Sequence, residues 1–189
     1  MKSTKHIELI DVVDNGGRPT GQRKTWLNLI NDGDWRNVIH IWIINPNAQL
    51  LVQKRSVAKS AWKSLWDVSI GGGVSAGEEP TQAAVRELNE ELGIEVDQND
   101  LKKLGVWKVP KVVPEYNKES REFSHTYLLQ KDLMINDLSL EKKEVAQVAW
   151  RSLEELRAEI EDDKLYKNWV PHPKQYYLEV MNFIEERAE

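Results

Sequence analysis

Acidic residues that could bind a divalent cation are concentrated between Gly72 and Ile94. In a helix, Glu87, Glu90 and Glu91 would lie within roughly a 100° arc, because each residue turns by about 100°. Carboxylates so close together repel one another unless positive charge neutralises them. Arg86 lies four residues before Glu90 and supplies one such charge. A hard divalent cation such as Mg²⁺ or Mn²⁺ would supply the rest, because it prefers oxygen ligands.

The residues around this cluster predict a glycine-rich turn followed by a helix. Gly71–Gly73 would let the backbone come close to a ligand and aim a carbonyl at a metal. The helix is predicted over Pro80–Leu92, since proline suits a first turn and Gly93 suits the position just past the end. Apolar residues recur on one side of it, at Ala84, Leu88 and Leu92, and give it a buried face.

The rest of the chain mixes strands with helices. Apolar runs predict strands over residues 7–13, 37–45, 49–54, 104–109, 123–129 and 145–151, with a short apolar run at 68–70. Pro46-Asn47 predicts a hairpin turn between two of these strands. Further helices are predicted over 23–30, 153–160 and 173–187, the second with Ser152 and Glu155 as a capping box. This order indicates an α/β domain with a mixed sheet between helical layers.

The composition excludes several classes of protein. The chain of 189 residues is long enough for one domain with a real core. It has no cysteine, so a disulfide scaffold, a thiolate zinc site and a cysteine nucleophile are excluded. A net charge of −5 argues against binding a nucleic acid polymer. No apolar run approaches a membrane helix and the start does not read as a secretory signal, so we expect no membrane association and a cytoplasmic location.

The spacing from Gly72 to Ile94 resembles the Nudix box at every defined position. The pattern is Gly-x5-Glu-x7-Arg-Glu-U-x-Glu-Glu-x-Gly-U, where U is an aliphatic residue, with Glu78 as its first glutamate. The resemblance implies an α/β/α sandwich with a mixed β-sheet, covering about residues 35–160. We therefore expect a single Nudix domain over residues 1–189, with residues 1–35 as an N-terminal extension and 173–188 as a C-terminal helix.

The resemblance also implies roles for individual residues. Glu87, Glu90 and Glu91 would be metal ligands together with the Gly71 carbonyl, and Arg86 would orient the glutamates by ion pairing. Family members often recruit one more acidic residue as metal ligand or general base, and Glu144 is our choice because it ends a charged loop before a predicted strand. Other loop acids stay open as rivals for this role, namely Glu115, Glu119 and Glu122. Glu91 is the other candidate for the base.

Outside the box, the chain is similar to isopentenyl diphosphate isomerases and their hydrolase-like relatives. The similarity lies in residues 50–56, 63–67 and 69–73. The isomerases use a cysteine close to where Gly71 stands and a metal-binding histidine close to Gly73. Isomerisation needs a proton donor and an acceptor on opposite faces of the substrate. The chain has glycine at both places and no cysteine, which favours hydrolysis.

Other residues are candidates for binding the substrate. Lys54 and Arg55 end a predicted strand near the glycines and could contact phosphates, and Trp66 or Trp107 could stack on a ring. The alternative for the Lys54–Arg55 pair is a solvated strand end. His40 and His125 lie within apolar strands and are predicted to be hydrogen-bonded core residues, whereas His172 between two prolines is predicted to lie in a loop. We expect specificity to come from the loops at 56–66, 110–122 and 160–172.

The sequence thus predicts a Mg²⁺-dependent hydrolase that cleaves a diphosphate linkage. The expected substrate is a small molecule, either a nucleoside diphosphate derivative or a related organic diphosphate. The alternatives are an isopentenyl diphosphate isomerase-like enzyme and a non-catalytic diphosphate-binding regulatory module, since fold alone does not fix function. Residues 1–35 and the last helix exceed the minimal domain, and they are the segments we expect to support a homodimer.

Overall fold

In the computed structural model, which describes residues 8–188, one long strand organises the sheet. This strand, β3 (Trp35–Ile44), runs parallel to β9 (Lys118–Gln130) along its whole length. On its other edge it pairs antiparallel with β1, β6 and β4 at successive positions. The strands are β1 (Ile10–Val13), β2 (Pro19–Lys24), β3, β4 (Gln49–Arg55), β5 (Trp66–Asp67), β6 (Ile70–Gly73), β7 (Leu101–Lys108), β8 (Lys111–Val113), β9 and β10 (Val145–Ser152).

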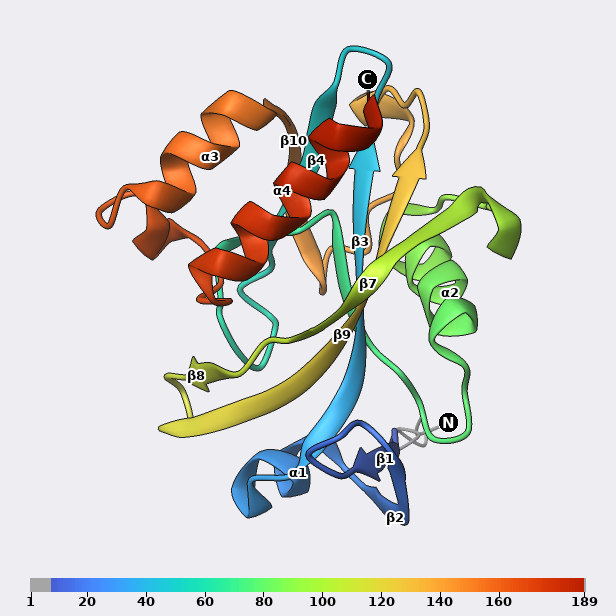
Figure 1. Ribbon diagram of the computed structural model, residues 1–189, viewed down its shortest axis with the longest axis vertical. Helices are drawn as coiled ribbons and strands as arrows, with labels where there is room; N and C mark the ends of the chain where they lie inside the picture. The colour runs from blue at the N-terminus through green and yellow to red at the C-terminus, as the bar shows by residue number, and fades with distance from the viewer. Residues whose placement is uncertain (1–7, 189) are drawn as a thin grey trace, which may run out of the picture.

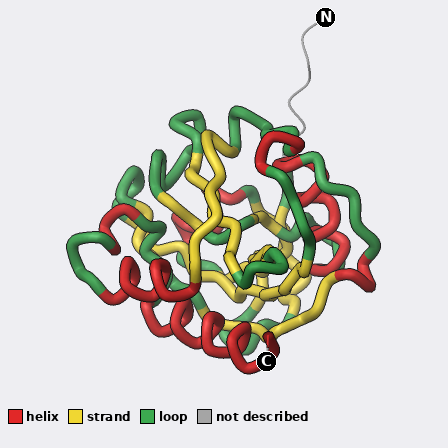
Figure 2. The backbone as a smooth tube through the Cα atoms, turned by 90° about the horizontal axis from the view of Figure 1, so that it is seen from above, coloured by secondary structure: helices red, strands yellow, loops and turns green. Residues whose placement is uncertain are grey.

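Helices cover both faces of this mixed sheet. Helix α2 (Pro80–Leu92) lies on one side of β3, and α3 (Leu153–Glu161) and α4 (Lys174–Ala188) lie on the other (Figure 1). The view from above shows the strands between these two groups of helices (Figure 2). A short fourth helix, α1 (Trp26–Asp32), follows β2. The predicted α/β/α sandwich with a mixed sheet is therefore confirmed.

The alternation of side chains along β3 produces two hydrophobic cores. Ile39, Ile41 and Ile43 face α2 and pack in one core with Leu88 and Leu92. Trp42 and Ile44 point the other way and pack against α3 and α4. Because both faces of β3 are covered, its residues read as a nearly continuous apolar run instead of an alternating one.

Helix α2 has the predicted bounds, with Pro80 and Gly93 at the predicted positions. Glu79 caps its start in a capping box with Gln82, and Pro80 occupies the first turn. Gly93 ends the helix in the left-handed conformation, with φ of 70°. A β-carbon disfavours that conformation, so glycine suits the position. The predicted cap of α3 by Ser152 and Glu155 is also present.

Several predicted elements differ in their bounds. The predicted helix over residues 23–30 was wrong at its start, because Arg23 and Lys24 belong to β2, and Thr25 caps α1 by accepting a hydrogen bond from the Asn28 N–H. Strand β9 begins at Lys118, five residues before the predicted 123, and forms a hairpin with β8 that the sequence did not predict. The predicted strand at 7–13 is observed from Ile10, and Ile7 lies outside the described residues.

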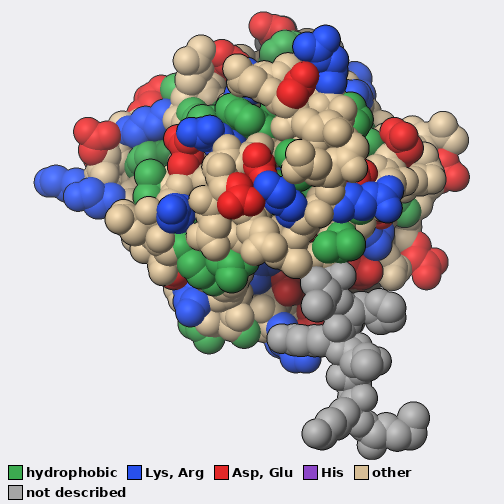
Figure 3. Space-filling view, turned by 90° about the horizontal axis from the view of Figure 1, so that it is seen from below, with side chains coloured by type: hydrophobic (Ala, Val, Ile, Leu, Met, Phe, Trp, Pro, Cys, Tyr) green, Lys and Arg blue, Asp and Glu red, His purple; other side chains and the backbone are tan. Residues whose placement is uncertain are grey.

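No helix among residues 8–188 is long and apolar enough to cross a membrane. On the face seen from below, lysine and arginine side chains are interspersed with aspartate and glutamate (Figure 3). That face therefore shows a mixture of charges instead of a broad basic patch.

Candidate active site

A polar cavity of about 810 Å³ lies at the junction of β3, β6 and α2. The glycine strand and the carboxylates of α2 form one wall, and the residues following β4 form a second wall. A third group of buried residues comes from β3, β8, β9 and the segment before α4. These residues form what we call the closed end of the cavity. The first group includes Gly71, Glu87 and Glu91, and the second includes Arg55, Lys59 and Trp62. The third group consists of His40, Lys111, Glu122 and His172. Segments far apart in the sequence thus meet at one site.

The glycine strand β6 lets α2 approach the sheet closely. Gly71, Gly72 and Gly73 pair with His40, Ile39 and Val38 of β3. A β-carbon placed on Gly72 would lie 2.4 Å from Cδ of Glu87, far inside van der Waals contact. Glycine at residue 72 is therefore required for the Glu87 carboxylate to reach its position beside the strand.

Arg86 ties the helix to the loop that precedes it. Its Nε and one terminal nitrogen each donate to Glu78 at 2.9 Å, and that same terminal nitrogen donates to the Gly73 carbonyl at 3.1 Å. The other terminal nitrogen donates to Glu87 at 2.9 Å and to Glu90 at 3.1 Å. Hydrogen bonding to Glu78 and the nearby negative charges raise the pKa of Arg86. One guanidinium thus positions two carboxylates of the helix and one of the loop.

Glu91 is the most buried of the three helical glutamates. Only 3% of its surface is exposed, and its carboxylate accepts a hydrogen bond from Nε2 of Gln53 at 3.2 Å. Burial raises the pKa of Glu91 to about 7, and the negative charge of Glu87 adds to this effect. Burial likewise raises the pKa of Glu87. Burial and the neighbouring carboxylate therefore both oppose ionisation of Glu91, which a bound cation would favour.

The donor set on this wall fits a hard divalent cation. Glu87 and Glu91 offer carboxylate oxygens, and β6 runs alongside them with the Gly71 carbonyl in the same strand. The side chains of Glu87 and Glu90 turn toward Arg86. Across residues 8–188, no three acidic or histidine side chains lie close enough together to hold a metal ion as they stand. Binding a cation through all three glutamates would therefore require side-chain rotation away from Arg86.

Glu144 also lines the cavity and forms an ion pair with Lys59. Of its rivals, Glu115 and Glu119 do not contribute to the lining. Glu122 does, but it is buried and already paired with two cations, Arg36 at 2.6 Å and Lys111. Although burial opposes its charge, Lys111 and Arg36 hold the pKa of Glu122 well below its usual range. Glu122 is thus a fixed anion and a poor proton acceptor.

Of the predicted substrate-binding residues, the structure brings only Arg55 to the cavity. Its guanidinium is buried, donates to the Ala61 carbonyl at 3.1 and 3.3 Å and lies 3.5 Å from the Asp67 carboxylate. Lys54 points to the other side of the sheet, where its ammonium lies over the Trp66 ring. Trp66 packs near Trp169 in the core beneath α4, and neither Lys54 nor Trp66 lines the cavity.

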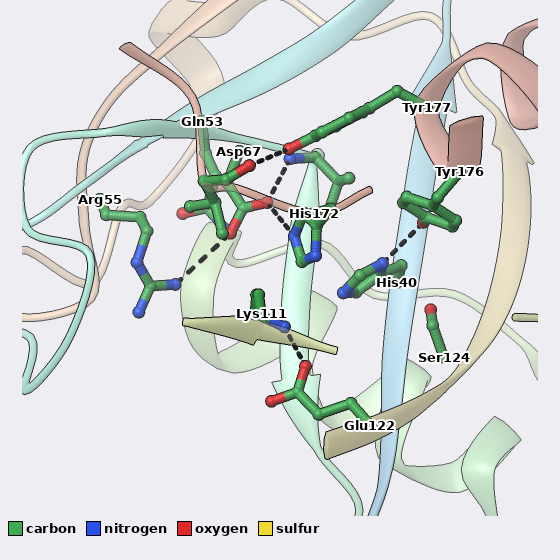
Figure 4. A network of polar contacts seen from close by, with 12 residues as sticks. His40, Gln53, Arg55, Asp67, Lys111, Glu122, Ser124, His172, Tyr176 and Tyr177 are labelled. Atoms are coloured by element: carbon green, nitrogen blue, oxygen red, sulfur yellow. Dashed lines mark hydrogen bonds and ion pairs between the residues drawn. The ribbon is translucent and has the colours of Figure 1, made fainter. Parts of the chain in front are cut away.

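The predicted hydrogen-bonded core role of His40 is confirmed, yet His40 also lines the cavity. Its Nδ1 lies 2.6 Å from the Tyr176 hydroxyl of α4. His172 lies in a loop as predicted, but it is buried, and its Nε2 lies 3.0 Å from Oδ1 of Asp67. Figure 4 shows the His172 ring between Asp67 and His40. Sequence reasoning missed this group because His40, Asp67 and His172 are more than 25 residues apart along the chain.

All three loops expected to carry specificity contribute to this cavity. Lys59 to Trp62 come from the first loop, Lys111 and Glu122 from the second, and His172 from the third. Trp62 adopts a positive φ of 51°, which is rare for a bulky residue, and its indole N–H donates to the Val112 carbonyl at 2.8 Å. Such strained backbone often occurs at ligand-binding sites.

Comparisons with known proteins agree with this combination of fold and site. The NUDIX domain family matches residues 34–172. An uncharacterized Nudix hydrolase of Listeria monocytogenes is 32% identical over 152 residues, which are 80% of this chain and 84% of that protein. Nudix hydrolase 3 of Arabidopsis thaliana is 33% identical over 153 residues, 79% of this chain but only 20% of that much longer protein.

A crystal structure of a Deinococcus radiodurans protein superposes with a TM-score of 0.64 at 20% identity, covering 95% of this chain and 98% of that one. The fold, the glycine strand and the glutamate-bearing helix define a hydrolase of diphosphate-containing substrates. The chain belongs to the Nudix hydrolase family. Similarity to the isopentenyl-diphosphate Delta-isomerase of Escherichia coli is 31% over 93 residues, about half of each chain.

Proposed function

We propose that the protein is a Mg²⁺-dependent hydrolase that cleaves a diphosphate linkage in a nucleoside diphosphate derivative or a related small organic diphosphate. The observation that carries this proposal is the pair of neighbouring carboxylates, the partly buried Glu87 and the buried Glu91, which line one cavity together with a glycine strand and the cationic side chains of Arg55 and Lys59. Carboxylates and cationic side chains in one cavity suit a metal-bound diphosphate, because the metal and the cationic side chains would both offset charge on its oxygens.

Glu87, Glu90 and Glu91, with the Gly71 carbonyl, would hold Mg²⁺ or Mn²⁺. When bound, such an ion offsets negative charge on the diphosphate and makes a coordinated water more acidic. A related structure is described as a bifunctional NMN adenylyltransferase/ADP ribose pyrophosphatase of Francisella tularensis complexed with AMP and a manganese ion, with a TM-score of 0.56. The two chains are 19% identical, and the match covers 81% of this chain and 42% of that one, so it supports the fold. The manganese ion in that structure makes Mn²⁺ an alternative cation to test.

The chain's own residues supply positioning and proton transfer. Arg86 holds Glu87 and Glu90 beside the cavity, and the buried Arg55 presents positive charge that cannot swing away, because Ala61 and Asp67 fix its guanidinium. Glu91 has a pKa of about 7, which is close to the value best suited to accepting a proton at neutral pH. Glu144 is the second candidate for the base, because Lys59 holds it at the cavity wall.

The missing cysteine argues against an isopentenyl diphosphate isomerase. The chain contains no cysteine, and Gly71, close to where the isomerases place theirs, has no side chain to donate a proton. A non-catalytic diphosphate-binding module is also disfavoured, because every glutamate of the box is retained.

The test is phosphate release from a panel of organic diphosphates with and without Mg²⁺. We expect Mg²⁺-dependent turnover by the wild type and a loss of about 10²-fold or more in kcat for Glu91→Gln. Glu95→Gln is the matched control, because Glu95 is an exposed glutamate just past α2 that does not line the cavity. Turnover that persists in EDTA, or that Glu91→Gln and Glu95→Gln lower equally, would contradict the proposal.

A further inference from the structure

The closed end of the cavity contains a buried hydrogen-bond acceptor without a protein partner. His172 is 1% exposed and lines the cavity, and its Nδ1 has no hydrogen-bond partner anywhere in residues 8–188. Its other ring nitrogen, Nε2, faces the Asp67 carboxylate at 3.0 Å. The two nitrogens of an imidazole point in different directions, so Nδ1 faces away from Asp67. Buried polar atoms are nearly always satisfied, which makes this one a candidate for contact with a ligand.

The surroundings determine which kind of hydrogen bond Nδ1 can make. Asp67 is an ionised carboxylate that also accepts from the Val68 N–H at 2.9 Å and faces Arg55, so Nε2 of His172 must be its donor. Burial and the positive charge of Lys111 lower the pKa of His172, which leaves the ring with one proton. That proton is on Nε2, and Nδ1 is therefore a pure acceptor.

Donors lie at the same end of the cavity. The Lys111 ammonium is buried, and its pairing with Glu122 uses one of its three N–H groups. Nε of Arg36 is a second buried donor, with no partner within the described part of the chain, although the same guanidinium binds Glu122. Both residues line the cavity, and Figure 4 shows Lys111 near the ring of His172. A complementary ligand must therefore donate to His172 and accept from Lys111 or Arg36.

We infer that the closed end is a subsite for a hydroxylated group, a sugar or polyol, attached to the diphosphate. A hydroxyl donates one hydrogen bond and accepts others, so it satisfies both kinds of partner. An alkyl or isoprenoid chain satisfies neither and would leave His172 and Lys111 desolvated. A fully ionised phosphate or carboxylate would accept from Lys111 but could not donate to Nδ1. This inference rests on the proposed function, since it places the diphosphate at the glutamate wall.

The test compares two five-carbon substrates, ribose 5-diphosphate and n-pentyl diphosphate, in the presence of Mg²⁺. We expect wild-type kcat/KM to favour ribose 5-diphosphate at least about 10- to 100-fold, because the alkyl chain leaves buried groups unpaired. His172→Phe should reduce this preference by about tenfold or more while changing the value for pentyl diphosphate little. The matched control is His125→Phe, since His125 also has an unpartnered Nδ1 among the described residues but does not line the cavity.

A second variant and a second readout separate this inference from the hydrolase proposal. If His172→Phe does not fold, His172→Gln is the substitute variant. It keeps an amide donor for Asp67, while its carbonyl acceptor does not occupy the position of Nδ1 in the ring. Calorimetry with both diphosphates reports binding independently of turnover. Equal turnover and equal binding of the two substrates would overturn the subsite and leave the hydrolase standing. Tighter binding of ribose 5-diphosphate, lost in the His172 variants, without any hydrolysis would support the subsite and refute the hydrolase. Failure to bind either compound would refute the subsite.

Discussion

Glu91→Gln should make the metal-free protein more stable at pH 8, although it removes a residue we propose for catalysis. The buried carboxyl has a pKa of about 7 in the folded state against the ordinary value of 4.5. A difference of about 2.5 units corresponds to about 3 kcal/mol. Because the folded state holds the proton more tightly, stability falls as pH rises from about 4.5 to about 7 and then stays at the lower level. Glutamine cannot ionise and can still accept from Gln53, so the variant escapes this loss.

The assay is urea or thermal unfolding of wild type and Glu91→Gln in EDTA at pH 5 and pH 8. The variant's advantage should grow by about 2–3 kcal/mol between these pH values, which is roughly 5–10 °C in Tm for a domain of this size. Saturating Mg²⁺ should stabilise the wild type more than the variant, because an ion that binds only the folded state raises stability. A difference between the two proteins that does not change with pH would refute the reasoning about Glu91.

Three further predictions concern other parts of the cavity. Gly72→Ala should lower kcat by about 10²-fold, because the added β-carbon displaces Glu87, while circular dichroism shows an intact fold. Unchanged kinetics would contradict this prediction. Glu122→Gln should lower the free energy of unfolding, measured in urea, by about 3–5 kcal/mol, because Lys111 stays buried without its main partner. An unchanged urea midpoint would show that this ion pair does not stabilise the fold. Glu144→Gln should lower kcat by about 10²- to 10⁴-fold with little change in KM if it is the base, and a change in KM alone would assign it to binding.

The sequence was most informative where one segment carries a complete local pattern. The glycines, Pro80, the glutamates and Gly93 all lie within 23 consecutive residues, so helical periodicity and capping rules predicted α2 and its acidic face correctly. The long apolar runs that form β3 and β4 were also predicted, because burial on both faces of a strand leaves an unmistakable composition.

The elements that were missed lack such a local signal. Strand β2 is almost entirely exposed, so it has no apolar alternation to detect. The first residues of β9 are mostly charged and read as a loop, yet Glu122 among them is buried because Arg36 and Lys111 neutralise it. A buried charge can be recognised only when its partners are known, and here the partners come from two other strands.

The residues of the site also fall into two classes, those that a local sequence pattern predicted and those that it did not. Arg86 and the glutamates are close in sequence, and the structure brings them together as expected. Lys54 and Arg55 were equal candidates in the sequence, but adjacent residues of a strand point to opposite faces, and only Arg55 faces the cavity. His172 reaches Asp67 from 105 residues away along the chain, a contact that no local pattern could indicate.

The most direct test of the central claim is a titration of the protein with Mn²⁺, followed by electron paramagnetic resonance, in the presence of a non-hydrolysable methylene diphosphonate. We predict that the wild type and Glu95→Gln bind Mn²⁺ with the same affinity, and that Glu87→Gln and Glu91→Gln each weaken binding by at least about tenfold, since each removes a charged oxygen ligand. Unchanged Mn²⁺ affinity in both cavity variants would contradict the claim that these glutamates hold the metal.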